Sequence, residues 1–78
     1  MSHEQILEIF SRFGFTTTDT EVYLCLILNG PQNSRSVAHF LSLLLNQVNQ
    51  SLKHLVQKQA ITKAKHPLRF WPIPLKNY

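Results

Sequence analysis

The 78-residue sequence has few acidic residues, and all four of them lie within its first 21 positions. Seven of the eight lysines and arginines lie after position 21, so residues 22–78 carry a net charge of +7 with no acid. A basic domain of this size usually binds a polyanion, although the charge alone would also suit an anionic membrane surface or simple solubility. The charge pattern therefore favours nucleic acid without selecting it.

Cysteine and long apolar runs are also scarce, and each shortage excludes a class of protein. The single cysteine, Cys25, cannot form an intramolecular disulfide, which agrees with a reducing compartment. No apolar run approaches the roughly 20 residues that cross a bilayer. The polar start MSHEQ does not resemble a signal peptide. We therefore expect a cytoplasmic protein without a membrane partner, folded as a single domain over residues 1–78.

The residue types that carry enzyme chemistry are present but not arranged for it. The four histidines have no ligand-like spacing with each other or with Cys25, so no metal is expected. The four acids form no recognisable pair with a base, and the sequence has no glycine-rich phosphate loop. We expect no catalytic residue and no cofactor, and we interpret Cys25 as a small core residue rather than a nucleophile.

The spacing of apolar residues predicts a mainly α-helical fold. Apolar residues recur at helical spacing over residues 4–13, and Gly14 supplies a stop. A second helix is predicted over residues 17–28, with Thr16 and Asp19 as its capping box. Its apolar side chains surround the helix almost completely, so we expect it to be the buried central helix.

Two shorter helices are predicted next. Asn33 or Ser34 caps a helix that runs to Ser42, and after a brief break a fourth helix ends near Gln59. Two short helices joined by about three or four residues make a helix-turn-helix.

The C-terminal segment predicts a small β-hairpin. Residues 60–65 and 69–73 have the composition of two short strands, with a turn at His66, Pro67 and Leu68 between them. Because Pro72 has no amide donor, we expect the second strand to be an edge or to pair on one side only.

The fourth helix has two unlike faces. Its core face consists of Val48, Ser51, Leu52 and Leu55. The opposite side has amides and a lysine but no acid: Asn46, Gln50, Lys53 and Gln57, with Asn49 and His54 at its margins. Asparagine and glutamine match adenine N6 and N7 in the major groove, and lysine donates to guanine or to a phosphate. We expect five residues to contact bases or adjacent phosphates: Asn46, Gln47, Asn49, Gln50 and Lys53. The alternative is that these amides are ordinary surface residues.

Positive charge is predicted to anchor the DNA backbone at two other places. Arg35, at the start of the third helix, would hold a phosphate together with Ser34 and free backbone amides, although a merely solvated arginine fits as well. The hairpin would act as a wing over residues 61–73, through Lys63, Lys65, His66 and Arg69.

The order of these segments resembles the amino-terminal winged helix-turn-helix domain of TrmB-like transcriptional regulators. The resemblance covers about residues 5–75 through a set of short motifs: Gly14-Phe15-Thr16, Val22-Tyr23-Leu24, Gly30-Pro31, Val48, Leu52, Leu55, Pro67, Phe70, Ile73 and Pro74. It implies three to four helices plus a C-terminal wing, with residues 45–59 as a recognition helix in the major groove. Such regulators have a further effector and dimerisation region, so no small-molecule effector is expected within this chain.

Several positions depart from the family pattern. Ser42 and Gln59 stand where the family usually has glycine. Leu44 and Leu45 replace residues that are usually polar, and they either form a dimer contact or tilt inward with the turn. Trp71 replaces a common basic residue, and its three alternatives are core closure, stacking on sugar or base, and a protein interface.

The sequence thus predicts a regulator that binds double-stranded DNA. A homodimer would suit this prediction, because specific binders commonly use two half-sites. The main rival is a winged-helix module that binds another protein through residues 43–45 and Trp71. A third alternative is RNA binding.

Overall fold

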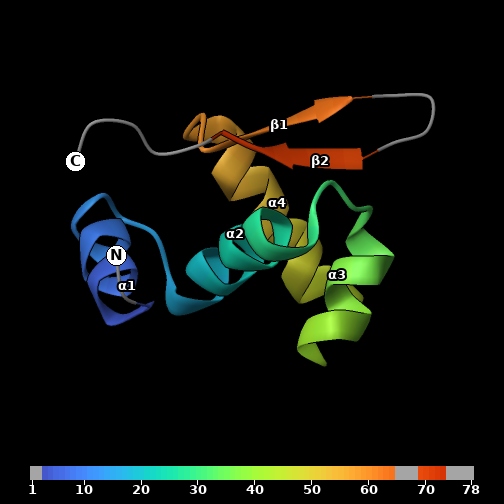
Figure 1. Cartoon of the computed structure of the whole chain (residues 1–78), viewed down its shortest axis with the longest axis horizontal. Helices are drawn as coiled ribbons and strands as arrows, with labels where there is room; N and C mark the ends of the chain where they lie inside the picture. Colours follow the sequence, from blue (N-terminus) through green and yellow to red (C-terminus); the bar gives the residue numbers. More distant parts are fainter. Residues whose placement is uncertain (1–2, 65–68, 74–78) are drawn as a thin grey trace.

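The computed structural model describes residues 3–64 and 69–73, and it contains helices followed by an antiparallel hairpin (Figure 1). In chain order the elements are α1 (His3–Arg12), α2 (Thr17–Asn29), α3 (Ser34–Leu41), α4 (Leu45–Gln57), β1 (Ile61–Ala64) and β2 (Arg69–Pro72). The predicted mainly α-helical fold with a small hairpin is confirmed. The turn expected at residues 66–68 lies outside the described residues.

Local sequence signals place the start of α2 and α3 where they were expected. Thr16 Oγ1 accepts the backbone N–H of Asp19 at 3.0 Å, and Asp19 Oδ2 accepts the N–H of Thr16 at 3.0 Å, which completes the capping box. Asn33, rather than Ser34, caps α3, because its Oδ1 accepts the N–H of Ser36 at 2.9 Å. Gly14 has a φ of 85°, which only glycine adopts readily, and the chain reverses there between α1 and α2.

The core forms where α2 packs against α1, α3, α4 and β2. The buried apolar residues come from every one of the helices and both strands: Phe10, Val22, Tyr23, Cys25, Leu26, Val37, Ala38, Val48, Leu52, Leu55, Ile61 and Phe70. Burial raises the pKa of the Cys25 thiol, against a smaller lowering by a hydrogen bond from Asn29. Cys25 is thus a protonated core residue, as predicted.

The expectation that α2 is buried all round was wrong at its last turn. Ile27 is 42% exposed and Leu28 is 77% exposed, whereas Val22 and Leu26 are fully buried. At about 100° per residue, Ile27 and Leu28 lie on either side of Leu24, so the outward arc of α2 is centred near Leu24. The described helices and strands pack on the core side of α2 and leave this arc exposed.

Among the described residues, two hydrogen-bonded contacts attach the hairpin to the helical part of the fold, one through Gln32 of the loop between α2 and α3 and one through Tyr23 of α2. The register of the hairpin pairs Ile61 with Pro72 and Ala64 with Arg69. On the other side of β2, the backbone of Gln32 exchanges two hydrogen bonds with Phe70, at 2.8 and 3.3 Å. The Ile73 N–H donates to the carbonyl of Ala60, and its own carbonyl accepts the Tyr23 hydroxyl at 2.6 Å.

As expected for the strand containing Pro72, β2 is an edge strand of the two-stranded sheet, and the isolated bridge to Gln32 adds pairing on its other side at one position. Phe70 lies two residues before Pro72, so its amide is free to donate to Gln32 while Pro72 pairs with Ile61. The missing donor at Pro72 therefore limits that one position and leaves the rest of β2 able to pair on both sides.

Candidate nucleic-acid interface

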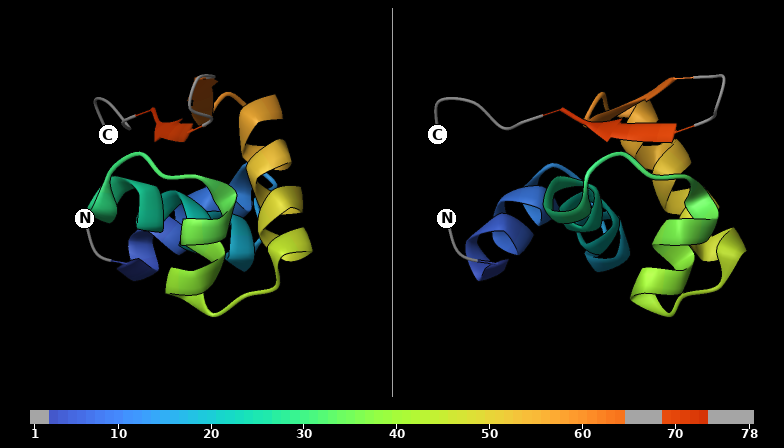
Figure 2. Two further views of the ribbon diagram at one scale, coloured as in Figure 1. Left: turned by 90° about the vertical axis from the view of Figure 1, so that its right-hand side faces the viewer. Right: turned by 45° about the vertical axis from the view of Figure 1, so that its right-hand side comes forward.

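Helix α4 extends from the end of α3 to the hairpin, so one side of it packs on the molecule and the other faces outward (Figure 2). The packed side is the predicted core face: Val48, Ser51, Leu52 and Leu55 are each buried. The five predicted contact residues are all exposed: Asn46, Gln47, Asn49, Gln50 and Lys53. The helical periodicity therefore separated the two faces of α4 correctly.

The turn between α3 and α4 occupies only residues 42–44. Ser42 adopts the left-handed conformation, with φ 56° and ψ 42°, and its N–H bonds back to α3. Left-handed backbone is disfavoured for side chains other than glycine, asparagine and aspartate. Helix α4 ends at Gln57, two residues earlier than predicted, and Gln59 has a φ of 62°. Both positions where the family usually has glycine are therefore left-handed here.

The start of α4 is closed by one of the predicted contact residues. Leu44 is the N-cap and has no side-chain oxygen to offer, so the helix uses the reciprocal bond alone: the Leu44 N–H donates to Gln47 Oε1 at 3.1 Å. Gln47 therefore has a structural role at this helix end in addition to its predicted contact with DNA.

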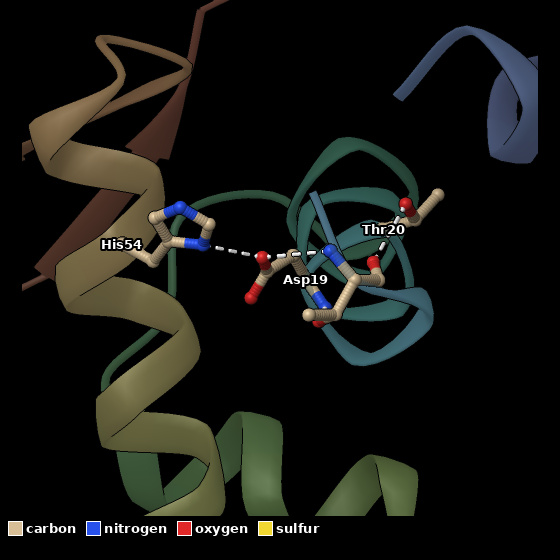
Figure 3. Close-up of polar contacts among 4 residues, drawn as sticks. Asp19, Thr20 and His54 are labelled. Atoms are coloured by element: carbon tan, nitrogen blue, oxygen red, sulfur yellow. Dashed lines mark hydrogen bonds and ion pairs between the residues drawn. The ribbon is translucent and has the colours of Figure 1, made fainter. Parts of the chain in front are cut away.

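His54 faces α2 and not the solvent side of α4. Its Nδ1 lies 2.6 Å from Oδ2 of Asp19, whose side chain is only 3% exposed (Figure 3). The imidazole ring also packs on Phe15, with the ring centroids 5.5 Å apart. Asp19 thus serves the α2 cap and α4 at once. Sequence reasoning missed this pair, because its members are 35 residues apart.

A hollow of about 370 Å³ lies where the start of α2 meets α4. Its lining is polar and hydroxyl-rich, from Thr16, Thr18, Asp19, Gln47, Gln50, Ser51 and His54. The carboxylate in this hollow is that of Asp19, which is already hydrogen-bonded to Thr16 and His54. The hollow therefore extends the amide-rich surface of α4 toward α2. The carboxylate that lines it is already hydrogen-bonded.

The hairpin brings further positive charge beside α4. Lys63 on β1 lines a groove of about 440 Å³ together with Asn49, Lys53 and Gln57 of α4. Arg69 is exposed at the start of β2. Lys65 and His66 lie outside the described residues. Lys63 of the predicted wing therefore shares one groove with the outward face of α4, whereas Arg69 is not among the residues that line it.

The residues predicted at the start of α3 are separate from that groove. Arg35 is exposed and Ser34 is half-buried in the first turn of the helix. Arg35 lines a different groove, beside the turn between α3 and α4.

Three apolar residues with open alternatives can now be placed. Leu44 is 66% exposed and Leu45 is 39% exposed, so the turn does not tilt them inward. Trp71 is 48% exposed while its neighbour Phe70 is buried, so Phe70 closes the core and Trp71 does not.

Two short helices, a tight turn and a flanking hairpin define a winged helix-turn-helix domain. The family model described as "Sugar-specific transcriptional regulator TrmB" matches residues 10–76. The chain therefore belongs to the TrmB family of transcriptional regulators.

A solved structure supports the same fold. The crystal structure of transcriptional regulator Tm0710 from Thermotoga maritima superimposes with a TM-score of 0.73 at 18% sequence identity. The match covers 90% of this chain and 51% of that protein, so the chain spans about half its length. A search of curated proteins found no match.

Two further searches were limited to the described residues. No helix in this part of the chain is long and apolar enough to cross a membrane. Within the same residues, no three histidine, cysteine, aspartate or glutamate side chains are grouped closely enough to hold a metal ion.

Proposed function

We propose that this domain binds double-stranded DNA with α4 in the major groove. The observation that carries the proposal is the outward face of α4, where amides and Lys53 are exposed and no residue of the helix is acidic. DNA is a polyanion, so a surface without free carboxylates approaches it with less electrostatic repulsion. Asp19, the acid that lies nearest this helix, is buried and paired with His54.

The side chains on this face have the chemistry that base edges require. Asn46, Asn49 and Gln50 each present an amide donor and an amide acceptor. This pair of groups is complementary to adenine, whose N7 accepts and whose N6 donates in the major groove. Lys53 donates to guanine or to a neighbouring phosphate. Gln47 also reaches the groove in this arrangement, through the amide nitrogen that its bond to Leu44 leaves available.

The remaining basic residues hold the backbone on both sides of α4. Lys63 and Arg69 of the hairpin act as the wing, together with Lys65 and His66, which lie between them in the sequence. Arg35 and Ser34 hold a phosphate at the start of α3. Backbone contacts of this kind fix the register of the protein on the duplex and carry no sequence information.

A homodimer on two half-sites is part of the proposal. One winged helix covers a small area, and specific binding by single modules is correspondingly limited.

The test is a titration of the protein into fluorescent random-sequence duplex DNA, followed by anisotropy at several salt concentrations. We expect the logarithm of the association constant to fall with the logarithm of salt, by about 0.9 for each neutralised phosphate. On a duplex selected from that random pool for tight binding, the combined variant Asn46→Ala, Gln50→Ala and Lys53→Ala should lose at least about a hundredfold in affinity, because each good base contact contributes about 1–3 kcal/mol at a preferred site.

Two lysines, Lys53 in α4 and Lys58 just after it, provide a test and its matched control. Lys53 faces outward beside Lys63, whereas Lys58 lines a groove next to Phe13 of the segment that joins α1 to α2. Lys53→Ala should lower the salt slope by about one, and Lys58→Ala should leave it nearly unchanged. Equal effects of the two changes would mean that the DNA contact is not on the outward face of α4. An absence of binding at low salt would instead favour a protein-binding winged helix, and a preference for RNA over the matching duplex would favour the RNA alternative.

A further inference from the structure

The two leucines that begin α4 are exposed at the end of the helix that would enter the groove first. Leu44 is the N-cap and Leu45 is the first helical residue, and they are 66% and 39% exposed. They come directly before Asn46. In a helix-turn-helix, the N-terminal residues of the second helix are the ones that contact base edges.

The groove around these leucines is basic as well as apolar. It has a volume of about 580 Å³ and is lined by Arg35, Ala38, His39, Ser42, Leu43, Leu44 and Leu45. No carboxylate is among these lining residues. An apolar surface next to an arginine and free of acid suits an occupant that is negatively charged and also presents apolar groups.

The major groove of DNA presents one such group. Thymine has a C5-methyl, and apolar side chains contact it there, while the adenine opposite presents N6 and N7 to asparagine and glutamine. Leu44 and Leu45 lie beside Asn46, so the same helix turn would offer partners for both bases of an A·T pair.

We propose that Leu44 and Leu45 pack against thymine methyl groups and give this domain a preference for A·T-rich sites. The inference rests on the proposed function, since it requires α4 to lie in the major groove. DNA is favoured over a protein partner because the leucines are continuous with the amide face and share their groove with Arg35. Removal of the methyl groups should therefore weaken binding.

The experiment compares two hairpin duplexes that differ only in the methyl group. One has alternating adenine and thymine, and the other has 2′-deoxyuridine in place of every thymidine. Dissociation constants are measured by anisotropy over a salt series that begins at low salt, and the two duplexes are compared at equal salt. The proteins are the wild type and the double variant Leu44→Ala, Leu45→Ala. Leu28→Ala is the matched control, because Leu28 is also an exposed leucine but lies at the end of α2.

We expect wild-type affinity to fall about fourfold for each methyl that is contacted, the effect of removing one buried carbon from a contact. The double variant should bind both duplexes with nearly the same affinity, and Leu28→Ala should keep the wild-type difference. Because Leu44 and Leu45 are exposed, the double variant should retain the wild-type circular dichroism spectrum. The single variant Leu44→Ala replaces only the more exposed of the two leucines, so it repeats the test with a smaller change to the protein.

The possible failures are distinguishable. If the wild type binds both duplexes equally and with a normal salt dependence, the methyl contact is wrong and the proposed DNA binding stands. If the double variant keeps the full preference for thymine, the methyl is recognised through DNA shape or another residue, and the assignment to Leu44 and Leu45 is wrong. If a folded wild type binds neither duplex at low salt, both the inference and the proposed function fail, and the leucines become candidates for a protein interface.

Discussion

Helices α2 and α4 have the same length, 13 residues, and pack against each other, yet they differ in almost every other respect. Helix α2 begins with a complete capping box and contains two acids, of which Asp19 is buried. Helix α4 begins with a leucine N-cap and contains no acid. The first helix supports the fold, and the second has one side available for a partner.

The difference between the two helices lies on their outward sides. On α2 the outward arc has Thr17 and Glu21 in its first two turns and apolar residues after them, with Leu28 the most exposed. On α4 the outward side has amides and a lysine in successive turns. A merely solvated helix usually mixes acids and bases, because Glu–Lys pairs stabilise it. The absence of acids from α4 is therefore the feature on which the proposed nucleic-acid surface rests.

The largest effect on stability should come from removing a buried side chain of α2. Leu26 is fully buried, so Leu26→Ala should lower the free energy of unfolding by about 2–5 kcal/mol. Leu28→Ala, in the same helix but at an exposed position, should change it by less than about 0.5 kcal/mol. Urea unfolding followed by circular dichroism measures both. Similar losses from the two variants would show that the outward arc of α2 is covered in solution.

A smaller effect should come from breaking the link between the two helices. Asp19→Ala removes the acceptor for both Thr16 and His54, so it should cost about 1–3 kcal/mol of stability. Asp19→Asn keeps an acceptor for the cap and should cost less. A double-mutant cycle with His54→Ala should give a coupling energy of at least about 0.5 kcal/mol.

The same pair should orient α4 for its partner. His54→Ala should therefore weaken DNA binding although His54 itself faces α2. Strictly additive losses of stability in the cycle, with unchanged DNA affinity for His54→Ala, would mean that the pair neither couples the helices nor positions α4.

The smallest effect should come from replacing the two residues with positive φ, one in the turn before α4 and one just after its end. Ser42 and Gln59 have positive φ values of 56° and 62°. Ser42→Gly and Gln59→Gly should each raise the free energy of unfolding by about 0.5–1 kcal/mol, because glycine adopts this backbone without steric cost. Lys58→Gly is the control in the same turn, since Lys58 has a φ of −86° and gains nothing from glycine. Loss of stability in both test variants would indicate that side-chain contacts of Ser42 and Gln59 outweigh the backbone strain.

The sequence predicted those features that depend on neighbouring residues. The Thr16–Asp19 capping box, the stop at Gly14 and the two faces of α4 all follow from spacings of a few residues. Features that depend on distant residues were missed. The His54–Asp19 pair joins two helices, and the bridge from Gln32 to Phe70 joins a loop to the hairpin.

The exposed Ile27 and Leu28 show a second reason for failure. An apolar pattern predicts which residues are able to be buried. Which of them are covered depends on how many helices and strands a small domain has to pack against them. For the site, the exposure of residues in α4 was predictable from periodicity. Their contact with DNA stays a prediction, because a helix face shows which groups are available and not which molecule binds them.

The measurement that tests this account most directly is a titration of ¹⁵N-labelled protein with short duplex DNA, followed by the amide signals in NMR spectra. The account predicts that the shifts concentrate on residues 44–53 of α4 with its turn, and on Lys63 and Arg69, with the side-chain amides of Asn46 and Gln50 among the most affected. The amides of α1 should move little. Shifts concentrated instead on α1 and the exposed end of α2, with α4 unchanged, would contradict the claim that α4 carries the DNA-binding face.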